Sequence, residues 1–318
     1  MNRHSLAASP ADIVALSYQV SVETGIPVAH VVKDFWVTEV LRGLVSAASD
    51  TGLEVCFKGG TSLSKAFGII ERFSEDVDIL VITSETNRGA VDTKLRALIA
   101  GVEARTNLSG VTQPAGTSKG IRRSTRFIYP APSGFTDAGV SPGVLLELGT
   151  RGGAFPAEIH GIRSIIASHR QELIGEFVEF DPLSVQVLGA ERTLVEKLMI
   201  LHTAASHETD SLMMRHARHY YDIHRLLSRQ QIRDAVAGRV LALARDVVTY
   251  STMAGRPVAE RPAEGFSESP AFSPGGEIIE KLRGVYDSQV LGQLVWPTSM
   301  RPSLDECVQI VHQFRGLL

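Results

Sequence analysis

The sequence has little of what marks a secreted or membrane protein. Its 318 residues include two cysteines, Cys56 and Cys307, which are too few for a disulfide scaffold. Neither has a Cys or His neighbour at metal-ligand spacing, so we expect both to be reduced and packed. No apolar run approaches the roughly 20 residues of a membrane span, and the N-terminal MNRHSLAASPADIV lacks the apolar centre of a signal peptide. We therefore expect a cytoplasmic protein with no membrane partner.

The chain also lacks an excess of either charge. It has 32 lysines and arginines against 35 acidic residues, for a formal net charge of −3. Without a broad basic field, overall charge does not attract nucleic acid, so we expect no DNA partner and only local patches for RNA. With 44% hydrophobic residues the composition is that of a globular protein, long enough for two domains or one large one.

Two patterns divide the chain. Residues 1–185 mix helical spacing with short β-branched runs, which is typical of an α+β sheet domain with leading helices. The expected strands are LEVCFKG, DVDILVIT, RSTRFIYPA, GVLLELGTRG and FVEFD. Residues 186–318 have amphipathic helical spacing and predict a helical domain. Within it, residues 254–275 are rich in Pro, Gly, Ser and Glu, which predicts a mobile loop that buries little.

The stretch from residue 57 to 78, FKGGTSLSKAFGIIERFSEDVD, begins with a strand that enters a Gly-Gly turn. Glycines let backbone N–H groups approach a ligand closely, and a turn that opens a helix suits phosphate. Thr61 and Ser62 add hydroxyls, and Lys65 lies one turn further on. We therefore consider Gly59, Gly60 and these three residues as nucleotide-binding. Taken alone, Gly-Gly-Thr-Ser is more simply a strand–helix turn with a cap.

Asp76 and Asp78 follow at the start of the next strand. Residues two apart on a strand point to the same face, so the two carboxylates lie side by side. Such a pair needs either a cation or contact with water, because unpaired buried charge is costly. Mg²⁺ binds carboxylate and phosphate oxygens together and suits the pair. The alternative is a solvated strand end.

The turn and the acids together resemble the nucleotidyltransferase superfamily, which has a polymerase-beta-like sheet domain. The resemblance implies that the turn binds a nucleoside triphosphate and the acids bind Mg²⁺. A third carboxylate is usual on a neighbouring strand, and Glu147 is the best candidate, ahead of Asp181. Pairing of Glu147 with Arg151 is an equal alternative.

A closer resemblance rests on five segments that occur in this order: KDFWVTEVLRGL, FKGGTSLSKAFGIIERFSEDVDIL, LLELGTRGG, ERTLVEKLMILH and RHYYDIHRLL. Over residues 30–228 the chain resembles the AbiEii family of nucleotidyltransferase toxins of type IV toxin–antitoxin systems, which includes the MenT toxins. This implies transfer of a nucleotide, from CTP or UTP, to the 3′ acceptor end of tRNA. It also implies a cognate antitoxin encoded nearby.

The resemblance adds Lys197 and Asp222 to the catalytic residues Asp76 and Asp78. Both added residues lie in the helical half, which favours a site in a cleft between the domains. Read without the resemblance, Lys197 is a surface charge and Asp222 pairs with Arg218 or Arg225.

Three further readings stay open. Arginines for RNA occur in two groups: Arg122, Arg123 and Arg126 near Lys119, and Arg215, Arg218 and Arg225 among three histidines, His216, His219 and His224. Ser74 lies two residues before Asp76, so a phosphate there would repel the triphosphate and act as a regulatory switch. Finally, the acceptor could be a small molecule or a protein, or the chain could bind nucleotide or RNA without catalysis.

Overall fold

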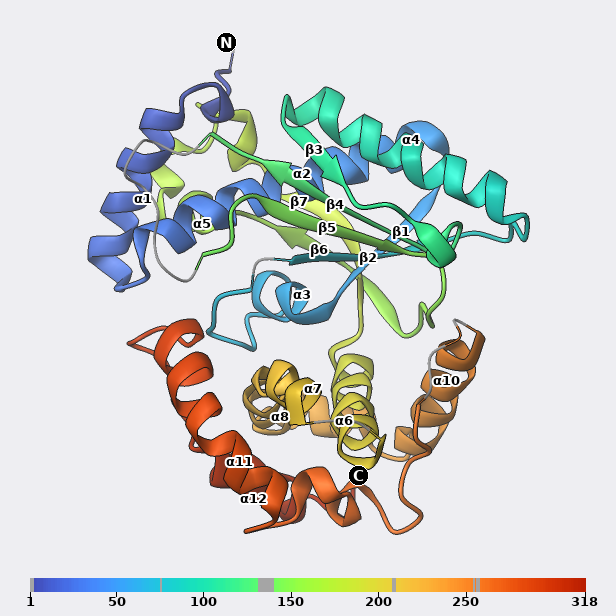
Figure 1. The fold of residues 1–318 in the computed structure, drawn as a ribbon. Coiled ribbons are helices and arrows are strands. Elements are labelled where there is room, and N and C mark those ends of the chain that lie inside the picture. Colours follow the sequence, from blue (N-terminus) through green and yellow to red (C-terminus); the bar gives the residue numbers. More distant parts are fainter. Residues whose placement is uncertain (1–2, 75, 131–139, 208–209, 254, 256–257) are drawn as a thin grey trace. The chain divides into compact units, whose positions relative to one another are not determined.

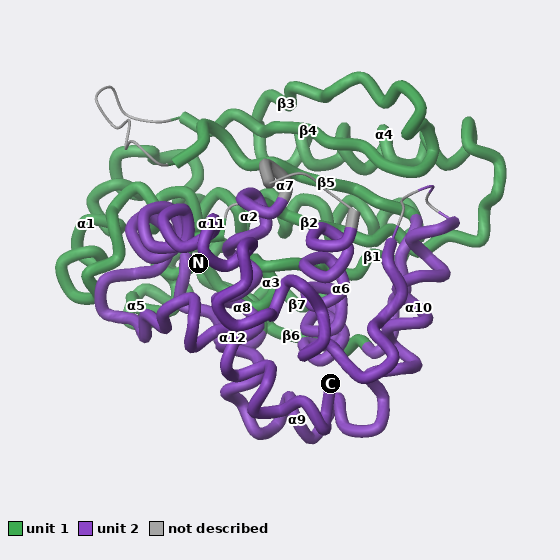
Figure 2. The backbone as a smooth tube through the Cα atoms, turned by 60° about the horizontal axis from the view of Figure 1, so that its bottom comes forward, with its two compact units in different colours: residues 1–66, 73–150, 157–187 green, residues 67–72, 151–156, 188–318 purple. Residues whose placement is uncertain are grey.

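The computed structural model describes residues 3–74, 76–130, 140–207, 210–253, 255 and 258–318. These residues form two compact units (Figure 2). Unit 1 contains residues 1–66, 73–150 and 157–187, and unit 2 contains residues 67–72, 151–156 and 188–318. Two short segments from the first half of the chain therefore belong to the second unit, which the sequence did not indicate. The boundary expected at residue 185 lies within the last strand.

The elements of unit 1 are α1 (Pro10–Thr24), α2 (Val28–Thr51), β1 (Glu54–Lys58), α3 (Gly59–Lys65), β2 (Asp76–Ile82), α4 (Arg88–Thr106), β3 (Ser109–Thr112), β4 (Arg122–Ile128), β5 (Val144–Gly149), β6 (Ala157–Ile162), α5 (Ile165–His169) and β7 (Leu183–Leu188). The strands form one mixed sheet in the order β3-β4-β5-β2-β1-β7-β6 (Figure 1). The α+β class expected from the sequence is confirmed. FVEFD is not a strand, because residues 178–180 form a 3₁₀ turn.

The two faces of the sheet differ in polarity. Alternate residues of β2 and β5, such as Val77, Ile79 and Leu146, are fully buried. The long helices α2 and α4 pack against each other and against this side of the sheet (Figure 1). The residues between them, which include Asp76, Asp78 and Glu147, are half-buried and point to the opposite side. The β-strand period therefore separates a core face from a polar face.

Unit 2 is helical, as the sequence predicted. Its helices are α6 (Ala190–His207), α7 (Asp210–His216), α8 (Arg218–Leu227), α9 (Gln230–Val236), α10 (Val240–Met253), α11 (Glu277–Val285) with a π-helical continuation (Tyr286–Leu294), and α12 (Leu304–Gln313). Helix α8 lies at its centre, in contact with α6 and α12. Segment 67–72 joins this unit through backbone contacts: the Glu71 N–H donates to the Tyr221 hydroxyl and the Trp296 N–H donates to the Glu71 carbonyl.

Residues 254–275 do not match the expected loop. Positions 254, 256 and 257 lie outside the described residues, but from residue 258 onward the segment packs against unit 2. Phe266 and Phe272 are fully buried, and the Tyr220 hydroxyl donates to the Ala271 carbonyl at 2.7 Å. The prediction that the segment buries little is therefore wrong, because two aromatic side chains outweigh the polar composition around them.

Both cysteines are free and buried, as expected. Among the described helices none is long and apolar enough to cross a membrane.

Replacing Phe272 with alanine should lower the free energy of unfolding by about 3–5 kcal/mol, because it removes a fully buried aromatic side chain. Urea denaturation followed by circular dichroism measures this difference. Leu241→Ala, at a half-exposed position in the same unit, is the control and should change stability little. Equal effects of the two substitutions would show that segment 258–275 does not depend on this packing.

Candidate active site

The Gly-Gly turn connects β1 to α3, and Gly59 is where glycine is required. Its φ is +81°, which is strained for any residue with a side chain. A Cβ at this position would lie 2.5 Å from Oδ2 of Asp78. The backbone of the turn therefore lies so close to the Asp78 side chain that no Cβ fits between them. Lys58, just before the turn, pairs with Asp78 in the antiparallel register of β1 and β2.

The hydroxyls after the turn are used within the protein. Thr61 Oγ1 donates to the Asp76 carbonyl at 2.5 Å, and Ser62 Oγ donates to the Gly59 carbonyl at 2.9 Å. Thr61 Oγ1 also lies 2.9 Å from Ser74 Oγ. Because Thr61 has one hydroxyl proton, already donated to Asp76, Ser74 is the donor in this contact. The bond from Thr61 to Asp76 holds the turn against β2, and Ser74 supports it by donating to Thr61.

Lys65 is bound to α2. Its ammonium lies 2.5 Å from Asp34 Oδ1 and donates to Thr38 Oγ1 at 2.8 Å. The side chain is nearly fully buried, with 5% of its surface exposed. The amine thus holds α3 against α2, and binding of a phosphate by Lys65 stays a prediction.

The predicted acids occupy neighbouring strands. In the parallel register of β2 and β5, Asp78 pairs with Glu147, and Glu147 pairs in turn with Ser124 on β4. Asp76, Asp78, Glu147 and Ser124 therefore share the polar face of the sheet. Asp181, the weaker candidate for a third acid, instead forms an ion pair with Arg3, and this arginine holds the Asp181 pKa below its usual value.

Glu147 is engaged with β4 and not only with the aspartates. It forms an ion pair with Arg122 and accepts a hydrogen bond from Ser124 Oγ at 3.1 Å, whereas the sequence had suggested Arg151 as its partner. Within the described ranges, no group of three His, Cys, Asp or Glu side chains is close enough to form a metal site. The assignment of Glu147 as a metal ligand therefore stays a prediction.

A cavity of about 350 Å³ lies beside Glu147 on the polar face. Arg122, Arg126, Leu145 and Ser118 contribute to its lining. Its size falls within the range of small-molecule sites, and arginine side chains suit an anionic ligand.

Unit 2 contains a buried cluster of charged side chains around Asp222. Arg72 donates two hydrogen bonds to the Asp222 carboxylate, from Nε at 2.6 Å and from Nη2 at 2.8 Å. The Lys197 ammonium lies 2.8 Å from Asp222 Oδ2 and 3.2 Å from Nδ1 of His219. All four side chains are buried. The alternative reading, in which Asp222 pairs with Arg218 or Arg225, is wrong; Arg225 pairs with Glu71 instead.

The cluster sets the charge states of its members. Burial alone would raise the Asp222 pKa, but the charges of Arg72 and Lys197 lower it well below its usual value. Burial lowers the Lys197 pKa, and Asp222 opposes this shift. Burial and the nearby Lys197 charge lower the His219 pKa well below its usual value, so the imidazole is neutral. His219 therefore accepts a hydrogen bond from the lysine ammonium.

Sequence reasoning missed Arg72 and His219. Arg72 is four residues before Asp76 in the sequence, yet it belongs to unit 2 and lies 150 residues from its partner Asp222. The sequence carried no signal for this role, because arginines are mostly exposed and the burial of Arg72 is visible only in the structure. His219 had been considered only as a surface cation.

The two expected arginine patches contain fewer exposed basic side chains than the sequence suggests. Arg225 and His219 are buried, and Arg123 binds Asp92 through two hydrogen bonds of 2.9 and 2.8 Å. These three side chains serve the fold and are not available as surface charges for RNA.

The mixed sheet, the glycine turn against β2 and the paired aspartates define the class: this is a nucleotidyltransferase fold. The family model described as nucleotidyl transferase AbiEii toxin, type IV TA system, matches residues 41–288, and the chain belongs to this family. The family consists of nucleotidyltransferase enzymes, as the sequence implied.

One solved structure with this fold is MenT4, a nucleotidyltransferase toxin from Mycobacterium tuberculosis H37Rv. The alignment has a TM-score of 0.59 and 18% sequence identity, and it covers 96% of this chain and 90% of that chain. At this identity the likeness concerns the fold. No curated protein matches the sequence.

Replacing Arg72 with methionine should destabilise the protein by about 3–5 kcal/mol, because it leaves the buried Asp222 carboxylate with one cation in place of two. Thermal and urea unfolding measure the loss. Arg72→Lys should recover only part of it, since lysine cannot form the two-pronged contact. The control is Arg283→Met, which removes a solvent-exposed ion pair and should have little effect. An Arg72→Met protein of native stability would show that the cluster does not need this charge.

Proposed function

We propose that this protein is a Mg²⁺-dependent nucleotidyltransferase toxin that transfers a nucleotide from CTP or UTP to the 3′ acceptor end of tRNA. The main support is the glycine turn whose backbone lies against Asp78, on the sheet face that carries Asp76. It occurs in a chain of the AbiEii family. A nucleotide added to the acceptor end blocks aminoacylation and therefore translation. As a type IV toxin, the protein has a cognate antitoxin as its partner.

Asp76 and Asp78 are the residues that would hold the metal. Mg²⁺ is commonly bound by one or two carboxylates together with substrate phosphates, so the two aspartates fit without an all-protein cage. Gly59 also fits, because any larger residue would fill the space beside the Asp78 carboxylate. When bound, Mg²⁺ neutralises negative charge on the triphosphate. Glu147 is an additional candidate ligand, in competition with its ion pair to Arg122.

The turn residues bind the triphosphate mainly through backbone N–H groups. The hydroxyls of Thr61 and Ser62 already donate within the protein, so the backbone at Gly59 and Gly60 supplies the free approach that phosphate needs. Lys65 contributes least, because its amine is bound to Asp34. The cavity beside Glu147 has room for part of the nucleoside.

The family resemblance gives Lys197 a catalytic role, and the side chain is buried within unit 2. Asp222 and His219 hold its ammonium from two sides, which fixes its position before a substrate arrives. Asp222 is fully buried and paired with Arg72, so it acts on the lysine and does not touch the substrate. It is therefore a positioning residue.

In the reaction the acceptor 3′ hydroxyl oxygen forms a bond to the α-phosphorus. The bond between the α-phosphorus and the bridging oxygen breaks, pyrophosphate leaves, and the hydroxyl proton is released. The protein's contribution is positioning and charge stabilisation, as in other phosphoryl transfers.

The direct test supplies purified protein with total tRNA, Mg²⁺ and each of the four α-labelled NTPs. We expect label in tRNA with CTP or UTP. Asp76→Asn should reduce labelling by roughly 10²–10³-fold, because it removes one of the two carboxylates that would hold Mg²⁺. Asp12→Asn, on an exposed helix of the same unit, is the matched control and should leave labelling unchanged.

The outcomes separate the acceptors. Label that survives RNase but is lost on protease treatment identifies a protein acceptor. If cell extract is supplied and the label is found in neither the RNA nor the protein, the acceptor is a small molecule. If a folded protein labels nothing with any NTP, even with extract, the enzymatic proposal is wrong. Equal labelling by the Asp76→Asn variant would contradict the assigned site.

Ser74→Asp should abolish labelling of tRNA. Ser74 donates to Thr61, which holds the turn on β2, and a negative charge here would repel both the triphosphate and the aspartates. Ser84→Asp, at an exposed position beyond β2, is the control for added charge and should stay active. Full activity of Ser74→Asp would exclude regulation by phosphorylation at this serine.

A further inference from the structure

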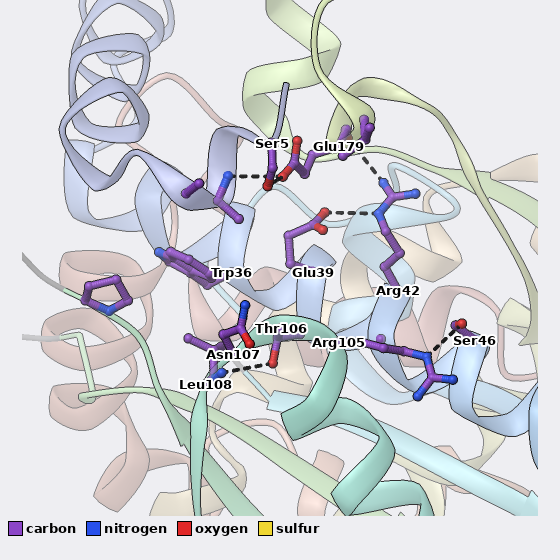
Figure 3. Close-up of a pocket in the computed structure, with 15 residues that line it drawn as sticks. Ser5, Trp36, Glu39, Arg42, Ser46, Arg105, Thr106, Asn107, Leu108 and Glu179 are labelled. Atoms are coloured by element: carbon purple, nitrogen blue, oxygen red, sulfur yellow. Dashed lines mark hydrogen bonds and ion pairs between the residues drawn. The ribbon is translucent and has the colours of Figure 1, made fainter. Parts of the chain in front are cut away.

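A second cavity lies in unit 1, in its helical layer. Its volume is about 550 Å³, and its walls come from α2, the end of α4, the N-terminal segment around Ser5 and the 3₁₀ turn at residues 178–180 (Figure 3). Helices α2 and α4 pack on the core face of the sheet, whereas Asp76 and Asp78 lie on the polar face. The cavity is therefore separate from the candidate active site.

Glu39 points into this cavity with an incompletely paired carboxylate (Figure 3). The residue is buried, with 9% of its surface exposed. Oε1 accepts one hydrogen bond of 3.1 Å from Arg42 Nε, and among the described residues no donor reaches Oε2. Because Oε2 is not fully buried, a ligand or solvent in the cavity can reach it.

The two neighbouring arginines donate mainly to other groups of the protein. Arg42 Nη2 donates to the carbonyls of Glu179 and Asp181. Arg105 donates to Ser46, to the Gly101 carbonyl and to Asp50. Most of the donors of these two arginines are therefore bound to the protein.

Glu179, the second acid of the cavity, is fully paired. Its carboxylate accepts from the Ser5 hydroxyl at 2.7 Å and from the backbone N–H groups of Leu6 and Ala7 at 3.0 Å each. Of the two acids in the cavity, Glu39 is therefore the one with unmet hydrogen-bonding capacity, and Trp36 Nε1 is a cavity-lining donor without a hydrogen-bond partner in the described part of the chain.

A comparison with Asp92 shows how weakly Glu39 is compensated. Asp92 is as deeply buried, but Arg123 binds both of its oxygens and lowers its pKa. For Glu39, burial raises the pKa to about 7, and the opposing charges of Arg42 and Lys65 do not offset it, while Glu179 raises it further. A cation at Oε2 would supply the additional positive charge that the Glu39 carboxylate lacks.

We propose that this cavity binds a small primary amine with an apolar body, whose ammonium donates to Glu39. The remaining walls suit such a body, since Trp36, Ala8, Leu108 and Val178 line the cavity with apolar surface. The volume suits a ligand of small-molecule size.

Benzylamine is the probe, and isothermal titration calorimetry on the full chain without nucleotide is the measurement. We expect binding at pH 8 that weakens about tenfold at pH 6, because Glu39 is mostly ionised at the first pH and mostly protonated at the second. The benzylamine ammonium stays charged over this range. Benzyl alcohol and phenylacetate have the same apolar body without the positive charge and should bind much more weakly.

The Glu39→Gln variant is the decisive control. Glutamine has the shape of the protonated glutamate, so the protein should fold as before, while benzylamine affinity falls at least about tenfold at pH 8 and loses its pH dependence. Glu54→Gln, at an exposed position of the same unit, should bind like the native protein. Asp76→Asn should also bind normally, which separates this test from the proposed function. Absence of benzylamine binding, equal binding by Glu39→Gln, or tighter binding of phenylacetate would overturn the proposal.

Discussion

The alternation of side chains along β2 is the constraint on which the rest of unit 1 depends. β2 lies between β1 and β5, and its buried residues Val77 and Ile79 belong to the core beneath α2 and α4. The same pleat turns Asp76 and Asp78 to the polar face, where the Gly59 backbone meets the Asp78 carboxylate. A shift of register by one residue would bury both acids and expose the core residues. Core packing thus fixes the direction of the acids.

In unit 2 the organising interaction is a buried carboxylate with two cations. Asp222 could not remain ionised in the core without Arg72 and Lys197, and Lys197 could not remain charged there without Asp222. The three residues therefore depend on one another, and the lysine has a fixed position as a result. Because Arg72 is four residues from Asp76 in the chain, the same short segment contributes to the acidic strand of one unit and to the lysine cluster of the other.

Much of the fold and part of the candidate site could be predicted from the sequence. The glycine turn, the strand period of the acids and the helical second half are local properties, and the family motifs extend them to Lys197 and Asp222. Partners were predicted poorly. Read without the resemblance, Asp222 pairs within its own helix, whereas its main partner is 150 residues away. Lys65 was expected to face an anion, and it binds Asp34 on α2.

The sequence by itself determined which residues alternate and where a glycine turn lies, because backbone preference and periodicity act over a few residues. Its motif segments also showed which family the chain resembles. Only the tertiary structure decided which charges pair, how the segment around Phe266 and Phe272 is buried, and that Glu39 points into a cavity with one oxygen unpaired. These outcomes depend on which elements pack together. Burial then decides what each charge requires, since water no longer satisfies it.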